Sequence, residues 1–258
     1  MAYAIITGAS KGIGKAVSTE LAKRGFNLLL IARSENLLAE LSKNLNSKYQ
    51  VKVLTLGVDL SLDSSTDIIL RKIEEEQMDV QVLINNAGYG LWGRFDTLTL
   101  SEQEAMMRIN TFTMVRLTYL LLPYLKKQAK AYILNVSSTA AYQAVPTLAV
   151  YAASKSFVLQ FTRGLRYELK GNGISVSCLS PGPTDTNFMD AAGMHTPEMK
   201  KRAAKFNMKA EDVASIAMNG MFNGKSEIIP GFVNKFSTLL TYFVPKFITE
   251  KVAAGLYE

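Results

Sequence analysis

Hydrophobic positions along the chain follow two alternating patterns. Short continuous apolar runs rich in β-branched residues predict buried strands, at Tyr3–Thr7, Asn27–Ala32, Val51–Val58, Val80–Asn85, Ala131–Ser137 and Ile174–Leu179. Between them, apolar residues recur every three or four positions and predict helices, at Gly12–Gly25, Leu37–Leu45, Asp63–Gln77, Ser101–Lys127 and Ala149–Gly171. This alternation, with right-handed crossovers, predicts a doubly wound α/β fold whose parallel sheet has helices on both faces. No linker or repeat interrupts it, so we expect residues 1–258 to form a single domain.

Composition narrows the class of protein and its compartment. The chain has 258 residues, a net charge of +7 and a single cysteine, Cys178, which we expect to be a buried small hydrophobe. Without disulfides, and without a signal-peptide pattern at the N-terminus, we expect a cytoplasmic protein. No stretch of about 18 apolar residues predicts a spanning helix. Because the basic surplus forms no run of five or six, it favours anionic small molecules over nucleic acid.

A glycine-rich segment joins the first predicted strand to the first helix. Residues Thr7–Gly14 read Thr-Gly-Ala-Ser-Lys-Gly-Ile-Gly. Glycines there let the backbone turn tightly and approach a pyrophosphate at the helix N-terminus, where N–H groups and the helix dipole favour anions. The alternative is a plain glycine-rich turn, because the spacing differs from the more general Gly-x-Gly-x-x-Gly.

The end of the second predicted strand carries a basic residue, Arg33. An acidic residue near this point would bind the ribose hydroxyls of NAD, whereas an arginine suits the 2′-phosphate of NADP. No Asp or Glu lies within Asn27–Ser34, and Lys11 in the glycine segment adds a second positive charge. We therefore expect NADP(H) as cofactor, with a solvated arginine at a strand end as the alternative.

A tyrosine and a lysine, Tyr151 and Lys155, lie four residues apart on a predicted helix. Positions i and i+4 share a helical face, so the phenol and the ammonium project to the same side. A phenol has a pKa near 10, and a nearby cation favours the phenolate and lowers that pKa. Taken alone, such a pair is more often structural than catalytic.

Together these motifs resemble the classical short-chain dehydrogenases/reductases, over roughly residues 3–190. Further pieces in the family's order are Asp59-Leu60, Asn85–Gly88, Asn110, Ser138 and Pro181–Thr186. Each piece is weak, but the ordered set is specific. The resemblance implies an oxidoreductase that moves a hydride between a nicotinamide cofactor and a carbonyl or alcohol carbon of a small molecule.

The resemblance also implies roles for individual residues. Tyr151 would be the general acid in reduction and the base in oxidation, and Lys155 would lower its pKa and hold the nicotinamide ribose. Ser138 would donate a hydrogen bond to the substrate oxygen, and Asn110 would bind a water that links Lys155 to solvent. These four are the expected catalytic residues.

Cofactor contacts follow from the resemblance in the same way. Asp59 would contact the adenine, Asn86 the adenosine ribose region and Thr186 the nicotinamide carboxamide. The full set of expected NADP(H)-binding residues is Thr7, Gly8, Ser10, Lys11, Gly12, Ile13, Gly14, Arg33, Asp59, Leu60, Asn86, Ala87, Gly88, Tyr151, Lys155, Pro181, Gly182, Thr184 and Thr186.

Alternatives to an oxidoreductase are weaker. A nucleotide-sugar epimerase or dehydratase is disfavoured by the three residues between Gly8 and Gly12, since that branch of the family usually has two. A catalytically inactive, cofactor-sensing module is disfavoured because Tyr151 and Lys155 are both present. Within the leading class, general likeness and apolar segments favour a ketoacyl or steroid-like substrate.

Four other residues of the chain, a histidine, a serine and two aromatic residues, bear on the kind of site. His195 is the only histidine, so we expect no metal site; we expect it to be solvent-exposed or part of the substrate lid that the resemblance implies at residues 184–208. Ser138 has no histidine partner, which disfavours a hydrolase. Tyr89 and Trp92 follow Asn85–Gly88, and we weigh two alternatives for them equally: they line the substrate cleft, or they pack in the core.

The chain continues past the last predicted strand into a helical extension at residues 231–258. Apolar residues at 232, 236, 239, 240, 243 and 247 form one helical stripe, and Pro245 should break the helix. Because only Lys235 and Lys246 lie between Phe232 and Phe247, we expect packing, on the protein's own core or over the substrate cleft, or a dimer contact. Loose membrane attachment is the alternative. We expect a homo-oligomer, and the extension leaves dimer and tetramer both open.

Overall fold

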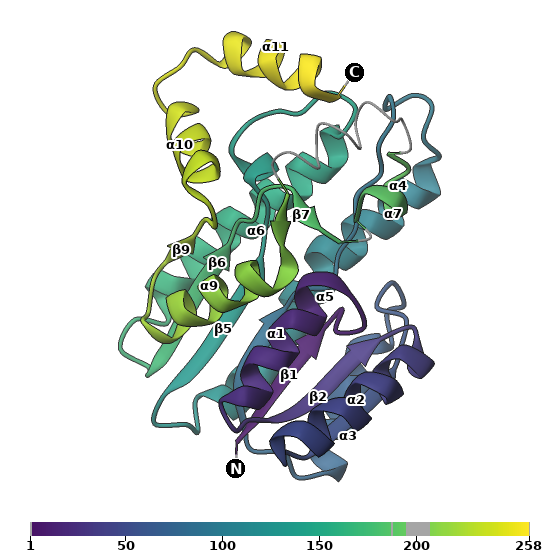
Figure 1. The fold of residues 1–258 in the computed structure, drawn as a ribbon, viewed down its shortest axis with the longest axis vertical. Helices are drawn as coiled ribbons and strands as arrows, with labels where there is room; N and C mark the ends of the chain where they lie inside the picture. Colours follow the sequence, from purple (N-terminus) through teal and green to yellow (C-terminus); the bar gives the residue numbers. More distant parts are fainter. Residues whose placement is uncertain (1, 187, 195–206, 258) are drawn as a thin grey trace.

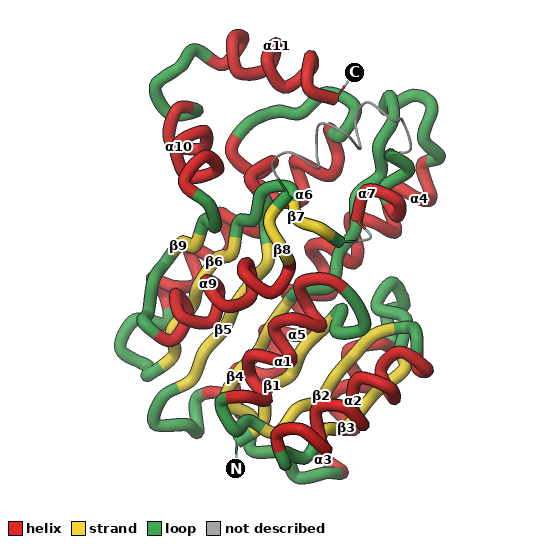
Figure 2. Tube along the Cα trace, viewed as in Figure 1, coloured by secondary structure: helices red, strands yellow, loops and turns green. Residues whose placement is uncertain are grey.

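A seven-stranded parallel sheet forms the centre of the molecule (Figures 1 and 2). The computed structural model describes residues 2–186, 188–194 and 207–257. The strands lie in the order β3-β2-β1-β4-β5-β6-β9. Their bounds are β1 Tyr3–Thr7, β2 Asn27–Ala32, β3 Val53–Gly57, β4 Val80–Asn85, β5 Ala131–Val136, β6 Ile174–Leu179 and β9 Glu227–Ile228. The order reverses between β1 and β4, which is where open α/β sheets bind ligands. The predicted doubly wound fold is confirmed.

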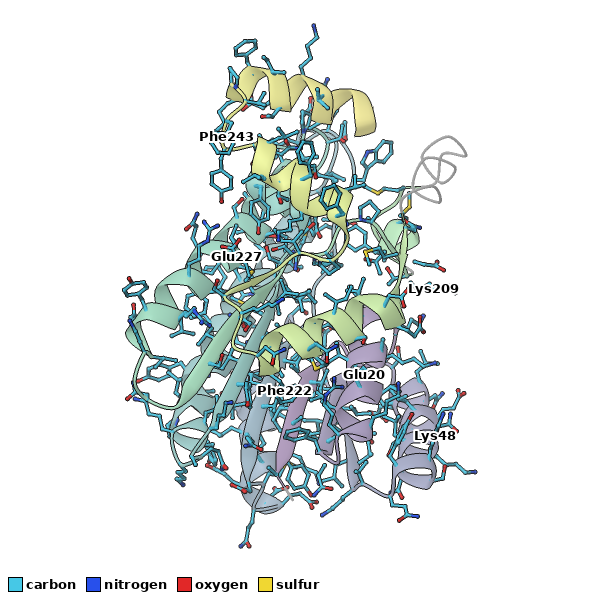
Figure 3. All side chains as sticks on the ribbon, turned by 60° about the vertical axis from the view of Figure 1, so that its left-hand side comes forward. Glu20, Lys48, Lys209, Phe222, Glu227 and Phe243 are labelled. Atoms are coloured by element: carbon cyan, nitrogen blue, oxygen red, sulfur yellow. The ribbon has the colours of Figure 1, made fainter. Side chains whose placement is uncertain are left out.

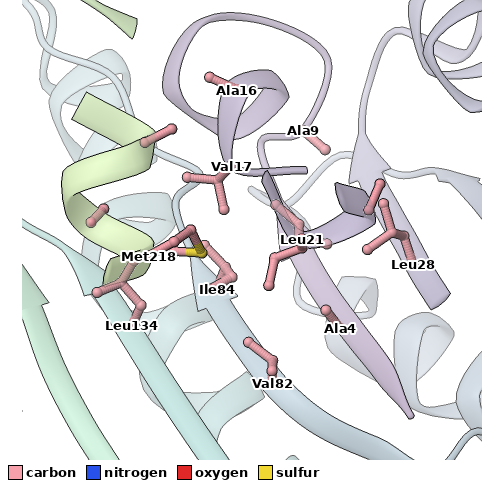
Figure 4. Packing of buried hydrophobic residues seen from close by; sticks show 14 of the residues in the cluster. Ala4, Ala9, Ala16, Val17, Leu21, Leu28, Val82, Ile84, Leu134 and Met218 are labelled. Carbon is pink, nitrogen blue, oxygen red and sulfur yellow. The ribbon is translucent and has the colours of Figure 1, made fainter. Parts of the chain in front are cut away.

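Helices cover both faces of the sheet. α1 (Gly12–Lys23), α2 (Glu35–Tyr49) and α9 (Ala210–Phe222) pack on one face, and Figure 4 shows Val17, Leu21 and Met218 in that cluster. α3 (Ser65–Glu75), α5 (Thr113–Leu125) and α6 (Ala149–Glu168) pack on the other. The other helices among the described residues are α4 (Leu100–Met107), the π-helical turn η1 (Arg108–Phe112), the 3-10 turn η2 (Thr139–Tyr142), α7 (Phe188–Ala191), α10 (Phe232–Leu240) and α11 (Lys246–Tyr257).

The burial of β1 explains the continuous apolar runs in the sequence. All five of its residues are buried, with Ala4 and Ile6 in one core cluster and Tyr3 and Ile5 in the other. Successive side chains of a strand point to opposite faces, so a strand with helices on both sides is apolar at every position.

Three local features depart from the predicted elements. The helix predicted over Ser101–Lys127 is interrupted by the η1 turn, and α9 was not predicted. A two-stranded parallel ribbon, β7 (Thr184–Asp185) with β8 (Met208–Lys209), also lay beyond the sequence pattern, because strands of two residues carry no periodicity. Among the described helices, none has the length and apolar character needed to cross a bilayer.

Candidate active site

The glycine segment turns from the carboxyl end of β1 into α1, at the point where the strand order reverses. Gly8 has φ +65°, and a Cβ there would lie 2.7 Å from Asn86 Nδ2 and 2.9 Å from Ala87 Cα. Only glycine fits this left-handed, crowded position. The first turn of α1 carries no acidic residue, so its N-terminal N–H groups suit a pyrophosphate. The loop is therefore a cradle that fits a dinucleotide.

Asn86 and Thr7 bind the glycine loop to the end of β4. Asn86 Nδ2 donates to the carbonyl oxygens of Thr7, at 2.9 Å, and Gly8, at 3.1 Å. Thr7 Oγ1 in turn accepts from the backbone N–H groups of Asn86 and Ala87, both at 3.0 Å. The Asn86 amide thus holds the loop itself in shape, a role that the sequence comparison with the family did not suggest.

Two basic side chains are exposed after β2 and just before α1. Arg33 is exposed at the end of β2, and Lys11 is exposed just before α1. Beyond β3, Asp59 Oδ1 accepts from the backbone N and Oγ of Ser61 at 2.9 and 2.8 Å. These bonds, helped by the charge of Arg33, lower the pKa of Asp59 below its usual value. The carboxylate is charged and preorganised to accept a hydrogen bond, while the two cations can bind a phosphate.

Tyr151 and Lys155 are both buried on one face of α6. Lys155 Nζ donates to the Val136 carbonyl at 3.0 Å and lies 5.9 Å from the centroid of the Tyr151 ring. Burial lowers the pKa of Lys155 to about 8. At neutral pH the side chain is therefore still mostly an ammonium, whose charge acts on the neighbouring phenol.

Asn110 enters the site through the η1 turn. Its Oδ1 accepts from the Tyr89 N–H at 3.1 Å, and its Nδ2 donates to the Tyr89 carbonyl and to Ser154 Oγ, both at 3.0 Å. A Cβ on Gly88 would lie 2.8 Å from Asn110 Oδ1 and 3.2 Å from Lys155 Nζ. The missing side chain at Gly88 lets these two polar groups approach. A π-turn is a frequent device for reorienting a functional side chain within a helix.

Ser138 follows β5 and caps η2, since its Oγ accepts from the Ala140 N–H at 3.1 Å. Its neighbour Ser137 is buried and donates from Oγ to the Lys155 carbonyl at 2.7 Å. The end of β5 is thereby bonded to the centre of α6. Ser137 and Ser154 are supporting residues that the sequence motifs did not single out.

The wall around Tyr151 is apolar. The Phe188 ring lies 5.4 Å from the Tyr151 ring, centroid to centroid, and a Cβ on Gly90 would lie 2.8 Å from Phe188 Cζ. The surrounding apolar cluster comprises Met106, Val145, Leu148, Ala152, Ala192 and Met194, with Tyr89, Leu91, Trp92, Val150 and Met189 packed against it. Tyr89 and Trp92 therefore pack against the apolar cluster that contains Tyr151. Phe188 was not predicted, because its contact depends on how α7 folds back.

The loop Pro181–Thr186 crosses from the end of β6 to the glycine segment. A Cβ on Gly12 would lie 2.9 Å from Thr186 Cγ2, so these two segments touch. At the other end, Gly182 lies against Asn234 of α10, which the sequence did not place near the site. Cys178 is fully buried in β6, as expected, and burial raises its pKa to about 11. His195 and most of the predicted lid lie outside the described residues.

Comparisons with known proteins point to a single family. The family model described as short chain dehydrogenase matches residues 2–196. The very-long-chain 3-oxoacyl-CoA reductase of Mus musculus is 34% identical over 212 residues, which are 81% of this chain and 66% of that protein. The chain thus spans about two thirds of that relative's length.

Solved structures agree with this result. A short-chain dehydrogenase from Sphingobium yanoikuyae in complex with NADPH is 27% identical, with a TM-score of 0.82 over 94% of this chain and 93% of that one. A family member from Burkholderia phymatum in complex with NAD has a TM-score of 0.84 over 93% and 92% of the two chains. At 23% identity, the second likeness shows the fold alone.

Proposed function

We propose, since the chain belongs to the short-chain dehydrogenase/reductase family, that it transfers a hydride between NADP(H) and a carbonyl or secondary alcohol of a largely apolar substrate. The observation that carries this proposal is the position of the buried Lys155 ammonium. It lies beside the Tyr151 ring and next to Asn110, within an apolar wall. A positive charge buried in this way strongly favours the phenolate form of a neighbouring tyrosine, because the site excludes water.

The chain's own residues would then move the proton. A bound nicotinamide supplies the hydride chemistry. In reduction, Tyr151 Oη gives its proton to the substrate oxygen, and Ser138 Oγ donates a hydrogen bond as negative charge develops there. Lys155 stabilises the resulting phenolate, and Asn110 orients a water that returns a proton toward Lys155. In oxidation, Tyr151 accepts the proton, so the oxidation rate should rise with pH.

The test of this mechanism is Tyr151→Phe. The change removes the proton donor and little volume, so NADPH binding should stay within about twofold while turnover falls at least a hundredfold, the usual scale of general acid–base catalysis. Tyr167→Phe, an exposed tyrosine at the end of the same helix, is the matched control. If the Tyr151 variant keeps a tenth of wild-type turnover, another residue must be the acid. A wild type that binds NADPH but never turns over would indicate a cofactor-sensing module instead.

The preference for NADP(H) is proposed from Arg33 and Lys11 at the mouth of the glycine loop, and the NADPH-bound relative supports it. An arginine–phosphate contact is charge-assisted, and its loss costs about 2 kcal/mol, or tens-fold in affinity. The dissociation constant for NADPH should therefore rise tens-fold in Arg33→Ala, while that for NADH stays nearly constant. Arg94→Ala is the control, because Arg94 pairs with Asp96 on the exposed surface. Equal affinities of the wild type for the two cofactors would contradict the proposal.

For the substrate, we propose a long-chain 3-oxoacyl thioester or a similarly bulky apolar ketone. The apolar cluster around Tyr151 and the activity for which the mouse relative is named support this class. NADPH consumption should be measured with ketoacyl thioesters of increasing chain length, hydroxysteroid precursors and small aldehydes. If kcat/KM does not rise with apolar length, the substrate class is wrong while the cofactor chemistry stands.

Assembly and location are proposed on separate grounds. Phe112, Tyr119 and Phe157 are exposed on η1, α5 and α6, and we propose that a homo-oligomer covers them. Light scattering of the wild type and Tyr119→Ser tests this, since a monomeric wild type would contradict it. We further propose that the chain acts as one domain in the cytoplasm, where the single thiol of Cys178 stays reduced.

A further inference from the structure

The C-terminal extension, residues 231–257, turns its apolar side chains outward. The exposed members are Phe232, Val233, Phe236, Leu239, Leu240, Tyr242, Phe243, Phe247, Ile248 and Val252. Phe232 is 83% exposed and Phe243 is 78% exposed. The prediction that this stripe packs on the protein's own core is therefore wrong. The helices do form, with Pro245 between them as expected (Figure 1), but the residues of the apolar stripe are exposed.

The inner side of the extension is polar instead. Its buried residues are Thr238, Thr241, Thr249 and Ala253. The hydroxyls of Thr238 and Thr249 donate to carbonyls of their own helices, Lys235 at 3.0 Å and Lys246 at 2.9 Å. Because these hydroxyl groups have hydrogen-bond partners within the extension, burying them costs little free energy. A helix beside a protein core normally has the opposite polarity, with the apolar stripe inward.

Contacts with the body hold the extension in this orientation. Arg163 Nη2, on α6, donates to Tyr242 Oη at 2.9 Å, while Arg163 Nε pairs with Glu227 Oε1 at 2.6 Å. The rings of Tyr142 and Tyr242 meet edge to face at 6.4 Å. The outward face is thus a consequence of specific anchoring at Tyr242. Figure 3 shows Phe243, the next residue, at the outer edge of the molecule.

The exposed face is too large for an ordinary surface. Besides the anchoring Tyr242, nine exposed apolar side chains of the extension present on the order of 1,000 Å², against a few hundred Å² for typical apolar patches of soluble monomers. In addition to Lys235 and Lys246, Lys251 of α11 is exposed, and Glu250 is the one acid among the described residues of the extension, which therefore carries a positive surplus that the stretch from Phe232 to Phe247 alone understates.

This charge distribution distinguishes the possible partners. A second copy related by a two-fold axis would bring like surfaces, and hence the same lysines, toward one another. An anionic lipid headgroup layer complements them instead, and aromatic side chains favour the boundary between headgroups and acyl chains.

We propose that the C-terminal extension docks on the surface of an anionic lipid bilayer, with its phenylalanines inserted at the acyl boundary and its lysines among the headgroups. The extension lies on the surface, as amphipathic helices with a large apolar face do. This proposal is independent of the reaction catalysed.

The test is flotation of the full-length protein with vesicles of phosphatidylcholine alone, or of phosphatidylcholine with about a third phosphatidylglycerol. Wild type should bind the anionic vesicles at least about fivefold more strongly than the neutral ones, since each lysine near an anionic surface contributes about that factor. Phe243→Ser should lower the partition coefficient about tenfold, and Phe243→Ser with Phe247→Ser about a hundredfold. Lys235→Gln with Lys251→Gln should remove most of the preference for anionic vesicles.

Tyr167→Ser is the matched control, because Tyr167 is 81% exposed but lies on the body in α6. It should bind vesicles as wild type does, and unchanged NADPH affinity shows that each variant is folded. Three results would overturn the proposal: a wild type that stays off both vesicles, an equal loss of binding in Tyr167→Ser, or equal binding to neutral and anionic vesicles. A molar mass that halves in the Phe243→Ser variant, without vesicle binding by wild type, would assign the face to a second copy.

Discussion

Replacing Lys155 with methionine should abolish turnover and yet stabilise the cofactor-free protein. Burial lowers the pKa of Lys155 to about 8, from an ordinary value of 10.5. At pH 7 the folded protein therefore carries a buried ammonium at a cost of about 3 kcal/mol, since each pKa unit corresponds to about 1.4 kcal/mol. Methionine has a similar length and no charge. It loses the bond to the Val136 carbonyl, worth about 1–2 kcal/mol. The net gain at pH 7 should be about 1–2 kcal/mol, or roughly 3–6 °C in Tm.

The sign of this effect can be checked through its pH dependence. The folded protein releases the Lys155 proton above about pH 8, whereas the unfolded chain keeps it to about pH 10.5. Over that interval the unfolded state binds more protons, so the unfolding free energy of the wild type rises with pH, by up to about 3 kcal/mol. The Lys155→Met variant lacks this rise. Its advantage at pH 7 should therefore disappear by about pH 9.5.

Urea unfolding of cofactor-free wild type and variant, at pH 7 and at pH 9.5, measures both effects. Lys126→Met is the control, because Lys126 is exposed and its loss should leave stability nearly unchanged at either pH. A Lys155 variant that is less stable than wild type at pH 7 would refute the reasoning, since it would mean that the ammonium stabilises its surroundings. The same pH slope in wild type and variant would refute it as well.

Two further substitutions test the scaffold of the site. Gly8→Ala should lower the unfolding free energy by about 2 kcal/mol or more and weaken NADPH binding at least tenfold, because φ is +65° and the new Cβ would collide with backbone atoms. Its control is Gly25→Ala, at φ +79° with open space around the new Cβ. That variant has the backbone strain without the collision, and it should lose only about 1 kcal/mol of unfolding free energy. Glu227→Gln removes the charge that pairs with Arg163 and should cost about 1–3 kcal/mol in urea unfolding, whereas Asp96→Asn, from an exposed pair, should cost almost nothing. Equal effects within either matched pair would contradict the structural argument.

Much of the fold can be predicted from the local pattern of apolar and polar residues. Each central strand is buried on both faces, so its continuous apolar run is visible in the sequence whatever its neighbours are. The pairing of Tyr151 with Lys155 follows from helical geometry alone. By contrast, the η1 turn and the β7–β8 ribbon were missed, because a π-helical turn within a helix and two-residue strands change the hydrophobic period too little to be seen; α9 was missed as well.

The central strands and the helices between them, the glycine loop and the shared face of the Tyr151–Lys155 pair all follow from the sequence, since each depends on residues close together in the chain. Only the tertiary structure decided that Gly88, Asn110 and Lys155 meet at one point, because that convergence needs three separate elements to pack. It also decided the direction of the C-terminal stripe. Periodicity shows which side chains share a helical face, but the direction of that face depends on what anchors the helix, here the bond from Arg163 to Tyr242.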